Sequence, residues 1–124
     1  MLDAASFDPT HGPNLLRIAC GAFFIPHAVG KIAEREFTLG FFVKAGFARP
    51  GWWLTAALAI ETVVATCLIL DLATRAAAIV AAAFLAVAAA ATWRVSGRRW
   101  YWNFGGPEYC VFWAIACAVV AMAR

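Results

Sequence analysis

Charged side chains are scarce in this sequence, and their scarcity limits what the chain can be. Asp, Glu, Lys and Arg make up only 14% of the 124 residues, whereas hydrophobic residues make up 65%. The apolar fraction of a soluble domain is roughly 45–50%, and so short a chain could not bury the excess. The sequence therefore predicts an integral membrane protein of one domain. A net charge of +3 that is small and dispersed gives no sign of a nucleic-acid partner.

Several chemical signatures are also missing. The chain has no Rossmann fingerprint and no phosphate-binding P-loop. Its four cysteines form no C-x-x-C pair and lie in apolar runs, so we interpret them as small buried hydrophobic residues. His11 lies in a polar lead of thirteen residues, which we expect to be retained because it lacks the pattern of a secretory signal. His27 is then the only histidine in an apolar run, and we predict neither a haem nor a metal site.

Four apolar blocks account for most of the chain. Each is close to the roughly 20 residues that a helix needs to cross a bilayer, and backbone groups in lipid must be paired within the segment. The sequence therefore predicts an all-α, four-helix up-down bundle, with helices at about 14–33, 51–70, 75–93 and 106–123. Pro26 should kink the first helix. The third is rich in alanine, which lets membrane helices approach closely, so we expect it to be central.

The connection at 34–50 mixes charged and aromatic residues and allows two interpretations. The run Phe41-Phe42-Val43-Lys44 is typical of a short segment that lies on the membrane surface. It is equally consistent with an ordinary loop packed against the bundle. In contrast, only a few residues separate the second and third predicted helices, so these two should form an antiparallel hairpin.

The stretch Trp100–Tyr109 differs from the rest of the sequence. Two adjacent glycines, Gly105-Gly106, permit a tight turn, and Pro107 suits the first position of a helix. Glu108 then falls in the first helical turn, where the helix dipole favours a carboxylate. The aromatic residues are also what an interfacial belt would contain. A belt would not require Asn103 or the double glycine, so the stretch is a candidate ligand-binding turn.

Glu61 is the residue with the clearest claim to a functional role. A carboxylate in the middle of an apolar helix is costly, so it should face protein or water and have a partner. In an up-down bundle His27 would lie roughly 9 Å below the end of its helix and Glu61 roughly 14 Å below the start of its own, beneath the same face. Lys31 lies four residues after His27 and projects from the same side. A structural role, in which Glu61 only fixes helix packing, is the alternative.

Taken together, these residues resemble the DoxX family of small four-helix bacterial inner-membrane proteins. The resemblance rests on the order and spacing of several motifs: Leu16-Arg17, Pro26-His27, Gly30-Lys31, Glu61, Thr74-Arg75, and Asn103-x-Gly-Gly-x-Glu108. It implies an association with membrane redox chemistry. One related subfamily supplies a membrane subunit of thiosulfate:quinone oxidoreductase, and other members are linked to thiol and oxidative-stress homeostasis. The resemblance assigns no catalytic residue.

Our functional hypothesis is a quinone-linked redox protein that acts as a subunit or partner of a membrane oxidoreductase. Glu61 and His27 are the candidate catalytic residues, since a buried Glu or His could relay the protons that quinone reduction takes up. The candidate ligand-binding residues are Lys31, Trp100, Asn103 and Glu108. The alternatives are a non-catalytic accessory subunit of a larger complex and, less favoured, a small-solute transporter. The expected partners are the lipid bilayer and either other membrane subunits or further copies of the chain.

The distribution of basic residues predicts an orientation. Seven of them lie in the first and third connections, or next to these connections, whereas Arg17, Arg75 and Arg124 lie toward the opposite face. By the positive-inside rule, both connections should be cytoplasmic and both termini outside.

Overall fold

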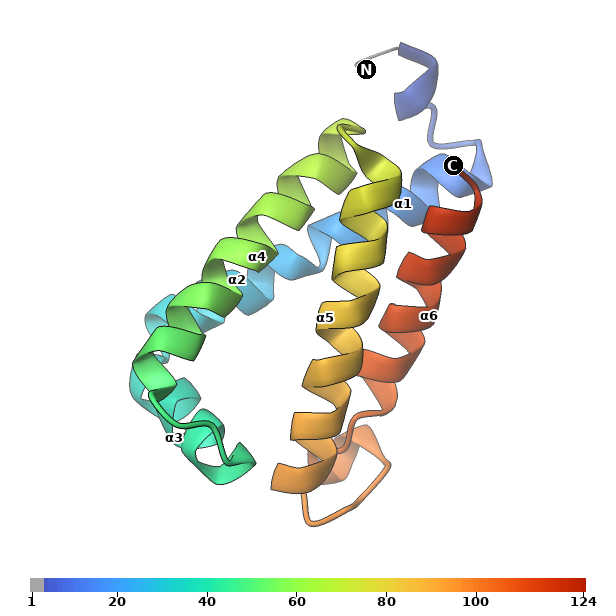
Figure 1. Cartoon of the computed structure of the whole chain (residues 1–124). Helices are drawn as coiled ribbons and strands as arrows, with labels where there is room; N and C mark the ends of the chain where they lie inside the picture. The colour runs from blue at the N-terminus through green and yellow to red at the C-terminus, as the bar shows by residue number, and fades with distance from the viewer. Residues whose placement is uncertain (1–3) are drawn as a thin grey trace.

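The computed structural model describes residues 4–124, so residues 1–3 of the polar lead lie outside the described part. Within this range the chain is helical and contains no strand. Figure 1 shows long helices side by side, with η1 and the C-terminus at one end of the molecule and α3 at the other. In chain order the elements are η1 (Ala4–Phe7), α1 (Gly12–Ala22), α2 (Phe24–Ala33), α3 (Arg35–Ala45), α4 (Pro50–Leu70), α5 (Thr74–Val95), η2 (Trp102–Phe104) and α6 (Glu108–Met122).

The first predicted helix is divided into α1 and α2 by a break at Phe23. The expected kink is present, but it lies three residues before Pro26. Proline has no N–H to donate to the carbonyl of the residue four positions earlier, and its ring crowds that carbonyl. For Pro26 this carbonyl belongs to Ala22, so the strain falls on the preceding turn.

The connection at 34–50 is not simply a loop, because it contains the eleven-residue helix α3. Gly46 ends this helix in the left-handed conformation, with φ of 93°, which glycine adopts without steric cost. Helix α3 packs against both α4 and α5, and the guanidinium group of Arg94 lies against Gly46. The segment is therefore packed against the bundle, as the second interpretation predicted, and it contains a helix that neither interpretation specified.

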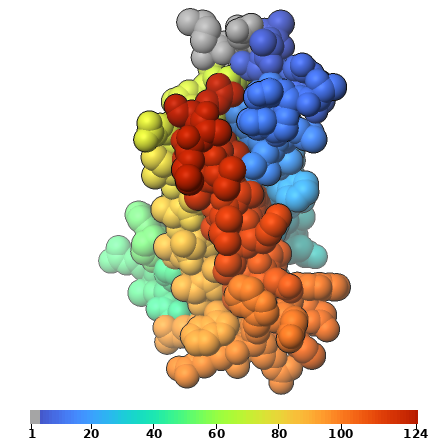
Figure 2. Space-filling model, turned by 90° about the vertical axis from the view of Figure 1, so that its right-hand side faces the viewer, coloured from blue at the N-terminus to red at the C-terminus, as the bar shows by residue number. Residues whose placement is uncertain are grey.

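Helix α5 is well buried, but it shares the centre of the molecule with α4, which packs against α1, α2, α3 and α5. Ala78 and Ala81 are fully buried, and α5 makes its most extensive contact with α6. On the other side, Gly21 of α1 faces Leu68 of α4 so closely that a Cβ at Gly21 would lie 2.9 Å from the Leu68 Cβ. Small residues thus allow close packing of α5 with α6 and of α1 with α4. Figure 2 shows α6 running beside the blue N-terminal segment that contains α1.

Three segments are long and apolar enough to cross a membrane: Gly12–Ala33, which combines α1 and α2, Pro50–Leu70, and Thr74–Val95. Helix α6 is apolar but has only 15 residues. At about 1.5 Å per residue it is shorter than the roughly 30 Å hydrocarbon layer. It begins at Glu108, two residues later than the sequence predicted.

Candidate functional site: a cavity with one buried ion pair

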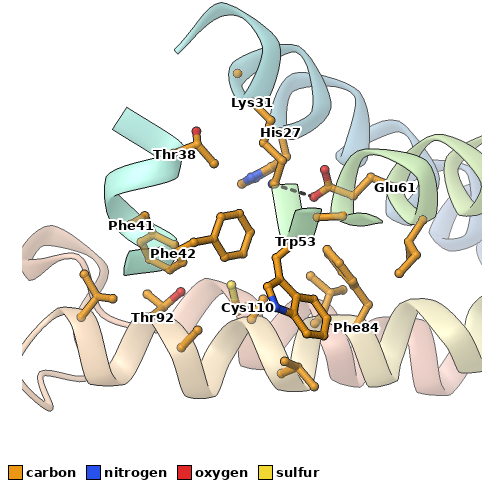
Figure 3. A pocket seen from close by; sticks show the side chains of 18 of the residues that line it. His27, Lys31, Thr38, Phe41, Phe42, Trp53, Glu61, Phe84, Thr92 and Cys110 are labelled. Atoms are coloured by element: carbon orange, nitrogen blue, oxygen red, sulfur yellow. Dashed lines mark hydrogen bonds and ion pairs between the residues drawn. The ribbon is translucent and has the colours of Figure 1, made fainter. Parts of the chain in front are cut away.

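A cavity of about 1020 Å³ lies among α2, α3, α4, α5 and α6. Its walls are mainly aromatic and aliphatic, and Figure 3 shows Phe41 and Phe42 from α3, Trp53 from α4 and Phe84 from α5 around it. Ligand pockets in proteins typically enclose about 300–1,000 Å³ and combine apolar walls with a few polar groups. The cavity has both properties.

Lys31 and Glu61 form an ion pair in the cavity wall. The Lys31 Nζ lies 2.9 Å from the Glu61 Oε2 and donates a hydrogen bond to it. Glu61 is only 3% exposed, and Lys31 is 17% exposed. The other carboxylate oxygen of Glu61, Oε1, is buried and accepts no hydrogen bond from any of the residues 4–124. The expectation that Glu61 faces protein and has a partner is confirmed. The partner is Lys31 and not His27, the other candidate catalytic residue.

His27 lines the same cavity and is held by aromatic rings of α6. Its imidazole stacks on Tyr109, with ring centroids 6.0 Å apart, and lies 5.1 Å from the ring of Trp113. Trp113 in turn donates its indole N–H to the carbonyl of Cys20 in α1, at 3.2 Å. Figure 3 shows His27 and Lys31 beside each other on α2, with Glu61 opposite on α4. The structure therefore brings together three of the six predicted site residues.

The other three, Trp100, Asn103 and Glu108, do not line the cavity. Trp100 and Asn103 are exposed, and Glu108 accepts a hydrogen bond from the backbone N–H of Trp102 at 3.3 Å. Any Cβ at Gly106 would collide with the carbonyls of Arg99 and Trp100. The polar and glycine residues of this segment thus build its turn. The segment contributes Phe104, Gly105 and Tyr109 to the cavity wall.

A second polar cluster, which the sequence did not predict, lies at the end of the molecule that holds the termini. Arg17, one of the three arginines that the sequence places toward this face, is only 1% exposed. Its guanidinium donates to the carbonyls of Leu68 and Ile69 at the end of α4 and to that of Ser6. The last carbonyls of a helix have no partner within the helix, so a buried arginine can satisfy them. The sequence pattern carries no signal for this contact, because the acceptors are backbone atoms.

Asp71, at the end of α4, is also part of this cluster. Its carboxylate lies 3.9 Å from the Arg17 Nε and 3.1 Å from an Arg124 Nη, and it accepts a hydrogen bond from the Thr74 hydroxyl. Burial alone would raise the pKa of Asp71. The hydrogen bonds from Thr74 and Ser6, with the charges of Arg124 and Arg17, outweigh burial and hold this pKa below its ordinary value. The cluster joins α1, the α4–α5 turn and the end of the chain.

The family model named DoxX matches residues 12–94. The chain belongs to the DoxX family. The match includes the Lys31–Glu61 pair and, from the second cluster, Arg17 and Asp71, and it ends before the Trp100–Tyr109 segment. Membership of the DoxX family, together with the three apolar helices, makes the chain a small integral membrane protein. No curated protein and no solved structure matches the chain significantly.

Proposed function

We propose that this DoxX-family protein binds a quinone in the cavity and serves as a subunit or partner of a membrane oxidoreductase. The observation that carries the proposal is a buried ion pair in an otherwise apolar cavity, with one carboxylate oxygen free of partners. A charged pair is costly to place in hydrocarbon and usually marks a functional site. Nothing in the packing of α2 against α4 alone requires a cavity of this volume beside it.

The residues present fit a quinone ring. Phe42, Trp53 and Phe84 offer aromatic surfaces on which a flat ring can stack. The Lys31 ammonium has three N–H donors. One of them binds Glu61, so the others can donate to a quinone carbonyl. A volume of about 1020 Å³ exceeds that of a single ring and accommodates part of an isoprenoid tail.

A bound quinone supplies an acceptor for two electrons and two protons. The protein residues would bind and orient the ring, exclude water and hold protons close to it. His27 lines the cavity with an imidazole that can both donate and accept a proton. Glu61 is a second proton acceptor that lines the same cavity. Glu34, at the end of α2, is exposed and also lines the cavity, so it can exchange protons between water and the Lys31–Glu61 pair.

The proposed arrangement in the membrane is a four-helix up-down bundle, in which α1 and α2 together form one span and α6 forms the fourth. The short length of α6 is compensated by the aromatic residues of the segment before it, which are typical of the membrane interface. We place the protein in the bacterial inner membrane, with the end that carries α3 on the cytoplasmic side. The exposed apolar residues of α6, such as Phe112, Ile115 and Met122, then face lipid, another subunit or a second copy of the chain.

Native mass spectrometry of the gently extracted protein tests the proposal. We expect a retained quinone, normal assembly of Glu61→Gln and His27→Gln, and reduced quinone occupancy in both. A Thr66→Val variant, which removes an exposed hydroxyl of α4 outside the cavity, should retain quinone as the wild type does. Copurified partner chains around an empty cavity would instead support the accessory-subunit alternative. Undiminished occupancy in both site variants would overturn the assignment of these residues.

A further inference from the structure

We propose that the cavity selects a ring that bears a hydroxyl group, a quinol or another phenol, over the corresponding quinone. This inference rests on the proposed function and specifies the ligand of the same site. The inference follows from the different surroundings of the two carboxylate oxygens of Glu61. Oε2 of Glu61 accepts a hydrogen bond from Lys31, whereas Oε1 is buried without a donor among residues 4–124. A buried acceptor that is left unsatisfied is costly.

A carboxylate in an ion pair can only accept hydrogen bonds. Carbonyl oxygens can also only accept, so a quinone leaves Oε1 of Glu61 unsatisfied. A quinol hydroxyl can donate to Oε1, and hydrogen bonds to charged acceptors are the stronger ones. The ligand that completes this site is therefore a donor.

The surroundings of Glu61 offer little competition for this contact. Glu61 lines a cavity whose walls are mainly apolar. The hydroxyl of Thr38, which also lines the cavity, donates to the carbonyl of Glu34 at 3.0 Å. The nearest cation, Lys31, is already bound to the other oxygen of the carboxylate. A ligand hydroxyl is thus the donor that the arrangement lacks.

Preferential binding of the quinol has a consequence for electron transfer. A site that binds two forms of one ligand with different affinities shifts the equilibrium between those forms by the ratio of the two affinities. Tighter binding of the quinol makes the bound quinone easier to reduce than the quinone in the bilayer. The site is then suited to accept electrons from a partner and to hold the reduced product.

Titration calorimetry in lipid nanodiscs can test this selectivity with two ligand pairs. The first pair is a short-chain benzoquinone and its benzoquinol under anaerobic conditions. The second pair is an alkylated phenol and its methyl ether. Only the phenol has an O–H donor, and neither compound undergoes a redox change in the assay. We expect the hydroxyl-bearing member of each pair to bind about tenfold more tightly, as one charge-assisted hydrogen bond implies.

Glu61→Gln provides the decisive variant, because an amide offers N–H donors as well as an acceptor. We expect the affinity ratio within each pair to fall to about one in Glu61→Gln, whereas Thr66→Val keeps the wild-type ratio. If neither the quinone nor the quinol binds the wild type, the proposed function fails, and this inference with it. If both bind and the quinone binds as tightly as the quinol, only the selectivity is refuted. The wild-type ligand pairs decide this even if the variant does not fold.

Discussion

Trp113 of α6 donates its indole N–H to the carbonyl of Cys20 in α1, at 3.2 Å. The acceptor lies just before the break at Phe23, where the helical hydrogen-bond pattern is interrupted. The same indole ring contacts Phe24, with centroids 4.3 Å apart, and lines the cavity beside His27. One side chain therefore joins the kinked first span to α6 and positions the histidine of the site.

Replacing Trp113 with phenylalanine should destabilise the protein while keeping an aromatic ring in place. The variant leaves the Cys20 carbonyl without its indole donor, and a lost buried hydrogen bond costs about 1–3 kcal/mol. We expect a lower midpoint of thermal unfolding in detergent, followed by circular dichroism. Trp102→Phe is the matched control, because Trp102 is 70% exposed and surface changes usually stay within about 0.5 kcal/mol. Equal midpoints for the two variants would contradict the role assigned to Trp113.

The close approach of α1 to α4 depends on the absence of a side chain at Gly21. A Cβ there would lie 2.9 Å from the Leu68 Cβ and 3.1 Å from the Ala65 carbonyl oxygen, so Gly21→Ala forces the helices apart. We expect a loss of about 1–3 kcal/mol of unfolding free energy, the usual cost of overpacking. Gly40→Ala in α3 is the control, because a Cβ at Gly40 meets no atom within 4 Å and alanine favours a helix by about 1 kcal/mol. Unfolding in a denaturant series should show opposite signs for the two substitutions.

Asp71 should make the stability of the protein depend on pH. The pKa of Asp71 is lower in the folded state than the ordinary value of an aspartate, so the ionised form stabilises the fold at pH values above the unfolded pKa. This contribution is lost as the pH falls through the folded pKa. Asp71→Asn should therefore be less stable than the wild type at pH 7, and the difference should shrink below about pH 4. A difference in unfolding midpoint that stays constant from neutral to acidic pH would contradict the pKa shift.

The orientation in the membrane can be measured with reporter fusions. Lys44, Arg49, Arg94, Arg98 and Arg99 lie in or beside the two connections at the end that carries α3, and basic residues favour the cytoplasmic side. We expect a reporter that is active only outside the cytoplasm to be active when it is fused after Arg124, and a reporter that is active only in the cytoplasm to be inactive there. Neutralising Arg94, Arg98 and Arg99 should weaken this preference and increase the fraction of molecules that insert with the opposite orientation. An active cytoplasmic reporter on the wild type would overturn the orientation and place the α3 end of the cavity outside.

Much of the helical architecture could be predicted because hydropathy reports directly on the cost of placing side chains in lipid. The same argument correctly required a partner for Glu61. The identity of that partner depends on side-chain reach: His27 and Lys31 share one face of α2, and the longer lysine forms the ion pair. The burial of Arg17 was not predictable, because its acceptors are carbonyls at the end of α4 whose position depends on packing. Helix α3 was missed because its mixture of charged and aromatic residues has little amphipathic pattern to distinguish it from a loop.

The Lys31–Glu61 pair allows its structural and functional roles to be separated. Lys31→Met leaves a buried carboxylate without its cation, and breaking such a pair typically costs about 3–5 kcal/mol, whereas replacing both partners with apolar residues is often neutral. We therefore expect Lys31→Met to unfold at a clearly lower temperature and the double variant Lys31→Met/Glu61→Met to recover most of the loss. A double-mutant cycle on unfolding free energies measures this coupling. The recovered double variant should still bind no quinol, because it lacks both the cation and the acceptor of the cavity. If it binds quinol as the wild type does, the pair has a purely structural role and the site must lie elsewhere in the protein.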